Sequence, residues 1–466
     1  MEKIRNGLNK YFKIQERGSS ITKEVLGGLT IFLAMVYILP VNAGILSSDG
    51  TGLTFGGVFA ATAIAAGISS IIMGVVANYP VGLASGMGVN AIFVYTGVYA
   101  LGFTGYEALG AVFVSGVLFL AISLTGIREA VINAIPKNLK LSIGAGIGFF
   151  IAFIGFQHAG IVVGSGATLV TLGDLSQPTV LLALGGVFLV FLLYAINKRV
   201  SHYAVIISIL AVGFVGVGLG MIFPELADVM PSLTNDSAGS LSDMKMVFGK
   251  AITSLPSLLS NPMAYALIFS LLFVDFFDTS GTLVAVGHDA NLFDKDGRLV
   301  NGDKALLADA IGTVAGSIVG TSTVTSFIES STGIKQGSRT GLTAVVVGVL
   351  FLLSLLIYPA FGFVSSVKAN QLEPVTALAL IYVGALMIGQ LKNIDWDDQI
   401  IVAVAFITIM VMILAYSISD GIAFGFVFYT VMMLFSKRKK ELNWILYVLT
   451  ILFVIHYIIK FVVIGV

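Results

Sequence analysis

The chain has 466 residues, of which 57% are hydrophobic and only 11% are charged. Soluble domains carry about 25% charged residues, so this composition excludes an ordinary soluble protein. The 25 basic and 25 acidic residues cancel, which excludes the basic surface of a nucleic-acid-binding protein. Cysteine is absent, so disulfides, thiolate metal sites and cysteine nucleophiles are excluded. The sequence predicts a polytopic membrane protein, whose 53 glycines indicate closely packed or broken helices.

A membrane span needs roughly 20 apolar residues. The predicted spans, in chain order, are 24–46, 55–77, 82–100, 106–125, 140–162, 178–196, 203–223, 263–286, 304–319, 320–334, 341–363, 374–391, 399–417 and 420–436. A last apolar stretch, 442–464, either crosses the membrane or lies at its interface with His456 and Lys460 directed to water. The N-terminus is too polar for a cleaved signal peptide, so the first apolar stretch is expected to be retained.

Basic residues predict the orientation, because cytoplasmic loops are enriched in lysine and arginine. They cluster in the N-terminal tail and in four loops, at Arg128, Lys137 and Lys140, at Lys198 and Arg199, at Lys335 and Arg339, and at 437–440. If the spans alternate, these clusters share one side. The segment 223–243 falls on the other side and carries only acidic charges, at Glu225, Asp228, Asp236 and Asp243. A cytoplasmic N-terminus is therefore predicted.

An internal repeat relates the two halves. IFLAMVYILPVNAGIL (31–46) aligns without gaps to IFSLLFVDFFDTSGTL (268–283), and two spans after each copy lies a Gly, Ser and Thr-rich segment, GLASGMGVN (82–90) or GTSTVTSFIE (320–329). Seven spans separate the copies, and an odd number inverts the second half. This pattern indicates an inverted-repeat transporter, whose interrupted segments line a cavity. Ordinary close packing of glycine-rich helices is the alternative.

Two aspartates lie in the middle of the eighth span. A charged side chain there costs at least about 2.5–3.5 kcal/mol, so it is a functional candidate. Asp275 and Asp278 share a helix face that Thr282 continues, and two such carboxylates cannot both ionise comfortably, so one is expected to hold a proton. Asp278 is favoured, because it precedes Thr-Ser-Gly, where the backbone is expected to open. The alternative is that one aspartate caps a broken helix or pairs with a distant basic residue.

Glu329 ends a hydroxyl-rich segment. The alternating polarity of 321–326 predicts a short strand before a half-helix, whose N-terminus presents free N–H groups to the cavity. A simple N-cap role is the alternative. Asn90 closes the matching segment of the first half, where a helix-packing hydrogen bond explains it equally well. Asp309 either relays protons or bonds to a neighbouring helix.

Other polar residues and motifs have simpler explanations. His158 is expected at the membrane interface, and Asp420 is expected to cap a helix, with Gly421 making the turn. The sequence contains no Walker lysine motif and no histidine pair with metal-ligand spacing. No cofactor and no metal are therefore expected. No nucleophile–base pair supports an enzyme.

Several motifs resemble those of AzgA-type purine permeases, relatives of the xanthine–uracil and nucleobase–ascorbate permeases. They are EVLGGLTIFLAMVYILPVNAGIL, PVGLASGMGVNAIF, VDFFDTSGTLVAVG (274–287), ADAIGT (308–313), GTSTVTSFIESSTGIKQGSRTGLTA (320–344) and SISDGIAFG. The resemblance implies an all-α polytopic fold of about fourteen spans in two inverted repeats of seven, with a short strand plus half-helix in segments 3 and 10.

It also implies a division into moving parts. A core domain of spans 1–4 and 8–11 (24–126 and 261–363) is expected to move against a gate domain of spans 5–7 and 12–14 (127–223 and 364–466). Residues 1–23 form a cytoplasmic tail and 224–260 an extracytoplasmic loop in this scheme. Family members import hypoxanthine, guanine or adenine with protons, here expected across the plasma membrane. The expected partners are thus a purine base, protons and the lipid bilayer, with no nucleic acid, and a homodimer is compatible with the sequence.

The resemblance assigns the site residue by residue. The carboxylate of span eight that holds the base falls on Asp278, and the glutamate of span ten falls on Glu329. The further candidates for substrate binding are Gly88, Asn90, Thr282, Thr325, Phe327 and Ile328, and those for proton coupling are Glu329, Asp278, Asp275 and Asp309. Thr282 stands where some relatives have His or Asp. Phe277 or Phe327 is expected to stack on the ring.

The chemistry favours a 6-oxopurine. One carboxylate can accept both N1–H and N2–H₂ of guanine in a planar, bidentate contact, whereas adenine presents an acceptor at N1. The alternative is an anion transporter or channel of the same fold. Because the expected cavity is lined by carboxylates, which repel anions, that alternative is disfavoured.

Overall fold

The computed structural model describes residues 2–125, 134–196, 198–201, 203–232, 239–294, 299–358, 372–436 and 438–464. Arg128, Asp236 and Lys437, and the domain boundaries expected at 126/127 and 363/364, lie outside these residues. Within them, nine helices are long and apolar enough to cross a membrane, and four shorter apolar helices accompany them. The expected all-α polytopic fold is confirmed.

The first half contains the following elements: α1 Glu2–Phe12, α2 Ile21–Met35, α3 Ile38–Leu46, α4 Phe55–Ile72, the π-helical η1 Met73–Ala77, β1 Leu83–Ser85, α5 Met87–Ala91, the π-helical η2 Ile92–Ala100, α6 Gly105–Leu124, α8 Lys137–His158, β2 Val162–Ser165, β3 Leu169–Leu172, α9 Pro178–Ile196, α10 Lys198–Ser201 and α11 Ala204–Ile222. The expected loop 224–260 instead forms the short helices η3 Pro224–Leu226, α12 Gly239–Val247, α13 Lys250–Thr253 and α14 Leu255–Ser260. Of these, α12 packs on α4, and α13 and α14 pack on α6.

The second half repeats the plan: α15 Ala264–Asp289, α16 Gly302–Val319, β4 Val324–Ser326, α17 Ser330–Lys335, α18 Gly341–Leu353, α19 Ala377–Ile388, η5 Gly389–Asn393, α20 Gln399–Leu414, α21 Ile418–Phe435, η6 Lys439–Glu441 and α22 Trp444–Ile464. The strand and half-helix expected in segments 3 and 10 are therefore present in both halves. One difference between the halves lies near the site, because the first span breaks between α2 and α3 whereas α15 is continuous.

Local sequence sets several helix starts. Ser20 caps α2, Thr104 and Glu107 form a capping box on α6, and Asp398 caps α20. The expectation that Asp420 caps α21 is wrong, because the Ser417 hydroxyl accepts from the Asp420 N–H instead. The turn before this helix is made by Tyr416, whose φ is +52°, and not by Gly421.

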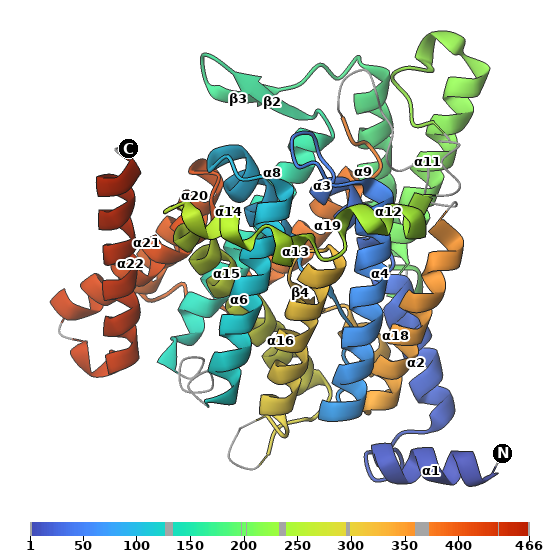
Figure 1. The fold of residues 1–466 in the computed structure, drawn as a ribbon, viewed down its shortest axis with the longest axis horizontal. Helices are drawn as coiled ribbons and strands as arrows, with labels where there is room; N and C mark the ends of the chain where they lie inside the picture. The colour runs from blue at the N-terminus through green and yellow to red at the C-terminus, as the bar shows by residue number, and fades with distance from the viewer. Residues whose placement is uncertain are drawn as a thin grey trace.

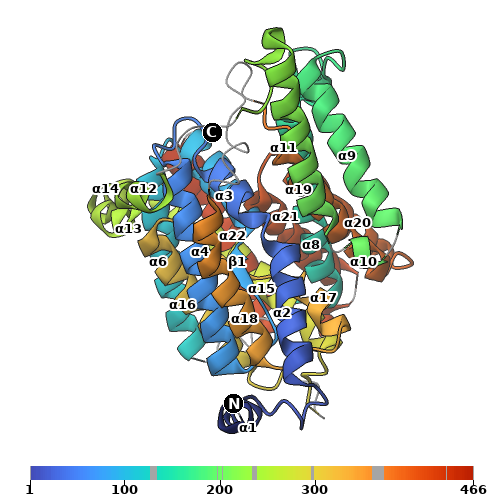
Figure 2. The same ribbon diagram turned by 90° about the vertical axis from the view of Figure 1, so that its right-hand side faces the viewer.

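The helices pack in two groups (Figures 1 and 2). A strand bundle contains α2–α6 with β1 and α15–α18 with β4, and a flanking bundle contains α8, α9, α11 and α19–α21. The last helix, α22, packs along α21, and His456 stacks on Phe269 of α15 with ring centroids 5.5 Å apart. His456 thus lies against the protein, contrary to the alternative that directed it to water.

Glycines allow the strand bundle to pack with backbones in contact. A Cβ on Gly348 of α18 would run into the Gly67 carbonyl of α4 and lie 2.7 Å from Ile71 Cγ1. We expect Gly348→Leu to lower the free energy of unfolding by about 1–3 kcal/mol, because overpacking forces the helices apart. Gly185→Leu on α9, where a Cβ meets nothing within 4 Å, is the matched control. Thermal unfolding in detergent measures both, and equal midpoints would contradict the prediction.

Candidate functional site

The two strands bring the two half-helices to one place. β1 and β4 pair antiparallel, with Leu83 opposite Ser326 and Ser85 opposite Val324. Each strand leads at once into a short helix, β1 into α5 and β4, through 327–329, into α17. The first N–H groups of α5 have no acceptor within the helix, so its N-terminus offers donors here. The first N–H groups of α17, those of Ser330, Ser331 and Thr332, already donate to the carbonyls of Phe327, Ile328 and Glu329, so α17 contributes only its positive dipole end.

Glu329 occupies the N-cap position of α17, but its side chain makes no capping hydrogen bond. Its Oε1 accepts a hydrogen bond from the Tyr37 hydroxyl at 2.7 Å, across 292 residues of sequence. Tyr37 is buried at the break between α2 and α3. Glu329 thus lies at the start of the helix without a capping hydrogen bond from its side chain, and Tyr37 fixes one of its carboxylate oxygens.

Asp278 faces the strand crossing. Its Oδ2 lies 3.4 Å from the Thr325 hydroxyl, and a Cβ on Gly86 would lie 3.3 Å from the same oxygen. The backbone just before α5 thus passes directly beside this carboxylate, and a Cβ on Gly86 would also run into Thr325 Cγ2 at 2.5 Å, which favours glycine here. Asp278 and Glu329 are both half-buried.

A chain of hydroxyl groups runs inward from Asp278. The Thr325 hydroxyl lies 3.1 Å from that of Thr279, which in turn lies 2.9 Å from Asp309 Oδ2. Asp309 is fully buried. A half-exposed carboxylate is therefore connected to a buried one through two hydroxyls, which can both donate and accept.

Asp275 points elsewhere. Its Oδ2 lies 3.3 Å from the Thr313 hydroxyl of α16, and it is fully buried. The same hydroxyl bonds to both backbone groups of Val324, so Asp275 supports β4 from behind. The expected opening of the backbone after Asp278 is wrong: α15 continues to Asp289, and the Ser280 hydroxyl bonds back to the Phe276 carbonyl at 2.5 Å.

Asn90 belongs to a buried amide network. Its Nδ2 donates to Asn42 Oδ1 at 2.6 Å, and Asn42 in turn donates to Thr62 and Thr321 at 2.6 and 2.9 Å. Ser322 also donates to Asn90. These bonds join α3, α4, α5 and the segment before β4, so Asn90 holds the crossing together, in keeping with its helix-packing interpretation.

The remaining predicted residues lie around the crossing with different accessibility. Ile328 is 39% exposed and Thr282 is half-buried. Phe327 is buried, as is Phe277, which packs against Phe426 of α21 with centroids 5.7 Å apart. Gly88 faces the flanking bundle, since its Cβ would lie 3.1 Å from Ile147 Cγ2. Neither phenylalanine offers a free face in this arrangement.

The electrostatics of the site are those of a carboxylate pair. Among the described residues, no ion pair reaches Asp278 or Glu329. In the same part of the chain, no group of three or more His, Asp or Glu residues is arranged to hold a metal. Tyr382 of α19 lies within electrostatic range of Glu329, so the flanking bundle contributes to this region. The arrangement suits a neutral ligand that donates hydrogen bonds.

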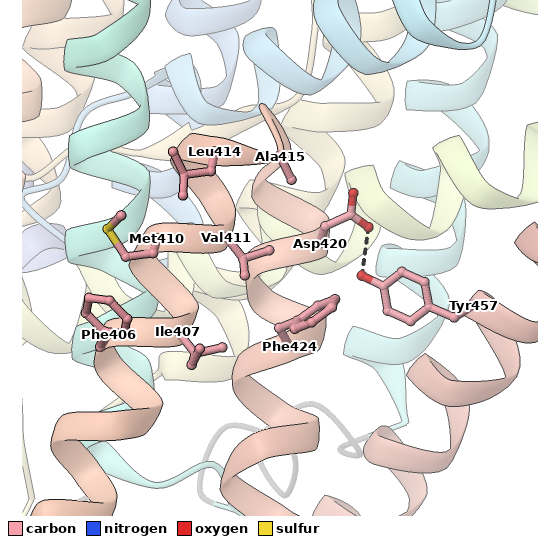
Figure 3. Close-up of a pocket in the computed structure, with 9 residues that line it drawn as sticks. All are labelled: Phe406, Ile407, Met410, Val411, Leu414, Ala415, Asp420, Phe424 and Tyr457. Carbon is pink, nitrogen blue, oxygen red and sulfur yellow. Dashed lines mark hydrogen bonds between the residues drawn. The ribbon is translucent and has the colours of Figure 1, made fainter. Parts of the chain in front are cut away.

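A large apolar cavity lies elsewhere, between α20, α21 and α22 (Figure 3). It has a volume of about 710 Å³, and its lining includes Phe406, Leu414 and Phe424. Its polar edge is Asp420, whose Oδ1 accepts from the Tyr457 hydroxyl at 2.7 Å. Because its walls belong to the outer helices and carry few polar groups, it is not the site built by the strand crossing.

Three polar residues at the crossing were missed from the sequence: Tyr37, Asn42 and Thr279. The internal repeat contains a signal for two of them, because the gap-free alignment that pairs Ile31 with Ile268 also pairs Asn42 with Thr279. Both side chains bond to the segment around β4. For Tyr37, no local pattern distinguishes it from the other 14 tyrosines of the chain.

Comparison with known proteins gives consistent matches over almost the whole chain. The model of a family described as "Permease family" matches residues 22–424. The guanine/hypoxanthine permease PbuG of Bacillus subtilis is 41% identical over 461 residues, covering 97% of this chain and 99% of PbuG. The adenine permease AdeQ of Escherichia coli is 38% identical over 452 residues, covering 97% and 96%.

Solved structures match in fold. The transmembrane domain of the cyanobacterial bicarbonate transporter BicA superposes with a TM-score of 0.59 at 15% identity, covering 86% of this chain and 97% of that domain. At this identity the likeness concerns the fold alone.

Proposed function

This chain belongs to the permease family of nucleobase transporters, and on that premise we propose that it imports purine bases, guanine and hypoxanthine first, together with protons. The relatives divide between guanine/hypoxanthine and adenine permeases at similar identity. The choice of base therefore rests on the chemistry of the site.

The observation that carries the proposal is the pair Asp278 and Glu329 beside two half-helix N-termini, with no ion pair to either carboxylate in the described residues. Glu329, oriented by Tyr37, accepts N1–H and N2–H₂ of guanine. Backbone N–H groups at the start of α5 face the acceptors O6 and N7. Adenine lacks the N1 donor and pairs less well with an ionised carboxylate.

Asp278 carries the coupled proton in this proposal. Two hydroxyls connect it to the buried Asp309, which gives the proton a route away from the base. Asp275 is directed to Thr313 and supports β4 instead. Some relatives have an ionisable residue at the position of Thr282. Because threonine does not ionise, we assign the coupled proton to the path from Asp278 to Asp309.

Alternating access follows from the two bundles. The strand bundle carries the site, and the flanking bundle packs beside it through α8, α11 and α21. We assign the strand bundle to the moving core and the flanking bundle to the gate. We propose that the protein resides in the plasma membrane; a cytoplasmic N-terminus is supported by the basic loops, which share one side if the spans alternate.

An uptake experiment tests this function. We expect accumulation of labelled guanine to fall at least about tenfold on addition of a protonophore, because an uncoupled carrier only equilibrates its substrate. Unlabelled guanine and hypoxanthine should compete more strongly than adenine, and sulfate or bicarbonate should not compete. Full accumulation without a proton gradient would refute the coupling, and competition by the anions would favour the anion transporter.

A further inference from the structure

A second cluster of polar and aromatic side chains lies far from the carboxylates, where the two bundles meet. The Tyr95 hydroxyl of η2, in the strand bundle, is 2.6 Å from His158 Nε2 at the end of α8, in the flanking bundle. His158 Nδ1 lies 3.3 Å from Glu373 Oε2, and the Glu373 N–H donates to the His158 carbonyl at 2.9 Å. The prediction of a simple interfacial histidine does not describe this arrangement.

The flanking bundle holds its half of the cluster rigidly. The Thr376 hydroxyl donates to Glu373 Oε2 at 2.6 Å. Burial raises the pKa of the Glu373 carboxyl, but His158 and the Thr376 hydroxyl outweigh it and hold that pKa below its usual range. These contacts fix the imidazole toward Tyr95.

Aromatic rings seal the same contact. The Tyr95 ring meets that of Tyr416 edge-on, with centroids 5.1 Å apart, and Tyr416 packs in the same way on Phe150 at 5.2 Å. The Tyr416 hydroxyl donates to Gln157 at 2.8 Å. Its left-handed backbone, φ +52°, is an uncommon conformation for a bulky residue, so the surrounding contacts must hold it.

The cluster lies at one end of the molecule. α8 ends at His158 and leads into the β2–β3 hairpin, which lies opposite α1 in Figure 1. A second contact closes this end, because a Cβ on Gly44 of α3 would lie 3.6 Å from both Glu373 Oε2 and Thr376 Cγ2.

The residues beside the two carboxylates are loosely packed in the other direction. One turn after Asp278, a Cβ on Gly281 would meet nothing within 4 Å, and Ile328 beside Glu329 is exposed. This turn of α15 leads toward the α1 end, where Tyr79 bonds to the Val300 carbonyl and Asn78 to that of Phe12. The exposed turn beside the carboxylates and the contacts of the Tyr95 cluster thus lie toward different ends of the molecule.

We propose that Tyr95, His158 and Glu373 form a gate that closes the substrate route at the end opposite α1 and separates once in every transport cycle. The proposal rests on the proposed transport function, since a gate needs a cycle. Tyr95 is the movable half of the gate, and His158 and Glu373 are the fixed half.

The absence of cysteine allows a direct test with introduced thiols. In the variant Gly44→Cys/Thr376→Cys, a short bis-methanethiosulfonate linker joins the two bundles at the gate through two disulfide bonds, which a thiol reductant can cleave. We expect the bridge to lower guanine uptake at least about tenfold, because a bridged protein cannot reach the state in which the gate is separated. Reduction of the bridge should restore uptake. Guanine binding should persist, since the bridge leaves Asp278 and Glu329 unaltered.

The matched control joins two residues of one bundle. Asn138 Oδ1 accepts from the Asp395 N–H at 3.2 Å, and both residues belong to the flanking bundle. Bridging Asn138→Cys/Asp395→Cys should leave uptake unchanged. The gate is refuted if fully bridged Gly44→Cys/Thr376→Cys transports at the rate of its reduced form.

A second measurement needs no transport. Ala91 is buried one turn before Tyr95, on the helix whose Gly88 faces Ile147. The reporter is Ala91→Cys, alkylated by a charged maleimide in lipid nanodiscs, where both membrane faces are exposed. We expect Tyr95→Phe to raise the alkylation rate about three- to tenfold, because the closed state loses one buried hydrogen bond. His158→Gln should act alike.

Tyr99→Phe, one turn after Tyr95 and 50% exposed, is the control and should leave the rate unchanged. Equal alkylation rates in all three variants would overturn the gate. If reduced Gly44→Cys/Thr376→Cys protein transports no purine at all, the proposed function fails. The alkylation rates of Ala91→Cys still decide whether the contact between Tyr95 and His158 opens.

Discussion

Glu329→Gln is expected to raise the KM for guanine by roughly 10- to 150-fold, the equivalent of losing one hydrogen-bonded charge worth about 1.5–3 kcal/mol. The amide turns an N–H donor toward a base that also donates, so the bidentate contact is lost. Hypoxanthine has one donor fewer and should lose less, and inhibition by adenine should not weaken. Uptake kinetics with the three bases measure this.

Tyr37→Phe is the matched control for that experiment. It removes the hydroxyl bonded to Glu329 Oε1 and leaves the carboxylate in place. We expect a rise in KM of only about two- to tenfold, the effect of one ordinary hydrogen bond. A guanine KM in Glu329→Gln that is no higher than in Tyr37→Phe would remove Glu329 from the binding site.

Asp278→Asn is expected to abolish coupling while sparing binding. Asparagine keeps the shape of the side chain and its contact with Thr325, but it cannot take up or release a proton. The steady-state ratio of internal to external guanine should therefore fall to about one, because an uncoupled carrier only equilibrates its substrate. Counterflow, which needs no net proton movement, should weaken less than about tenfold.

Asp275→Asn separates this effect from the general loss of a carboxylate in α15. Asp275 lies one turn earlier and contacts Thr313, outside the hydroxyl chain from Asp278 to Asp309. It should retain protonophore-sensitive accumulation, with thermal unfolding as a check on its fold. If Asp278→Asn still accumulates guanine against a gradient, the coupled proton travels by another group.

Much of the architecture could be predicted, because the bilayer imposes local rules. Apolar length marks a span, and the expense of a charge in hydrocarbon marks Asp278 and Glu329 individually. The hydroxyl-rich segments before α5 and α17 likewise indicated strand and half-helix. Predictions that depended on one residue's local chemistry were less secure: Thr279-Ser280-Gly281 does not open α15, and Asp420 does not cap α21.

The sequence alone determined the class of protein, the repeat and the two carboxylates, since each depends on composition or spacing within a few turns. Only the tertiary structure decided their partners. It joins Glu329 to Tyr37, Asp278 to Asp309 through two threonines, and Tyr95 to His158. A hydroxyl group costs little to bury once it is hydrogen-bonded and leaves no periodic pattern, so the partner of each carboxylate depends on how distant segments cross.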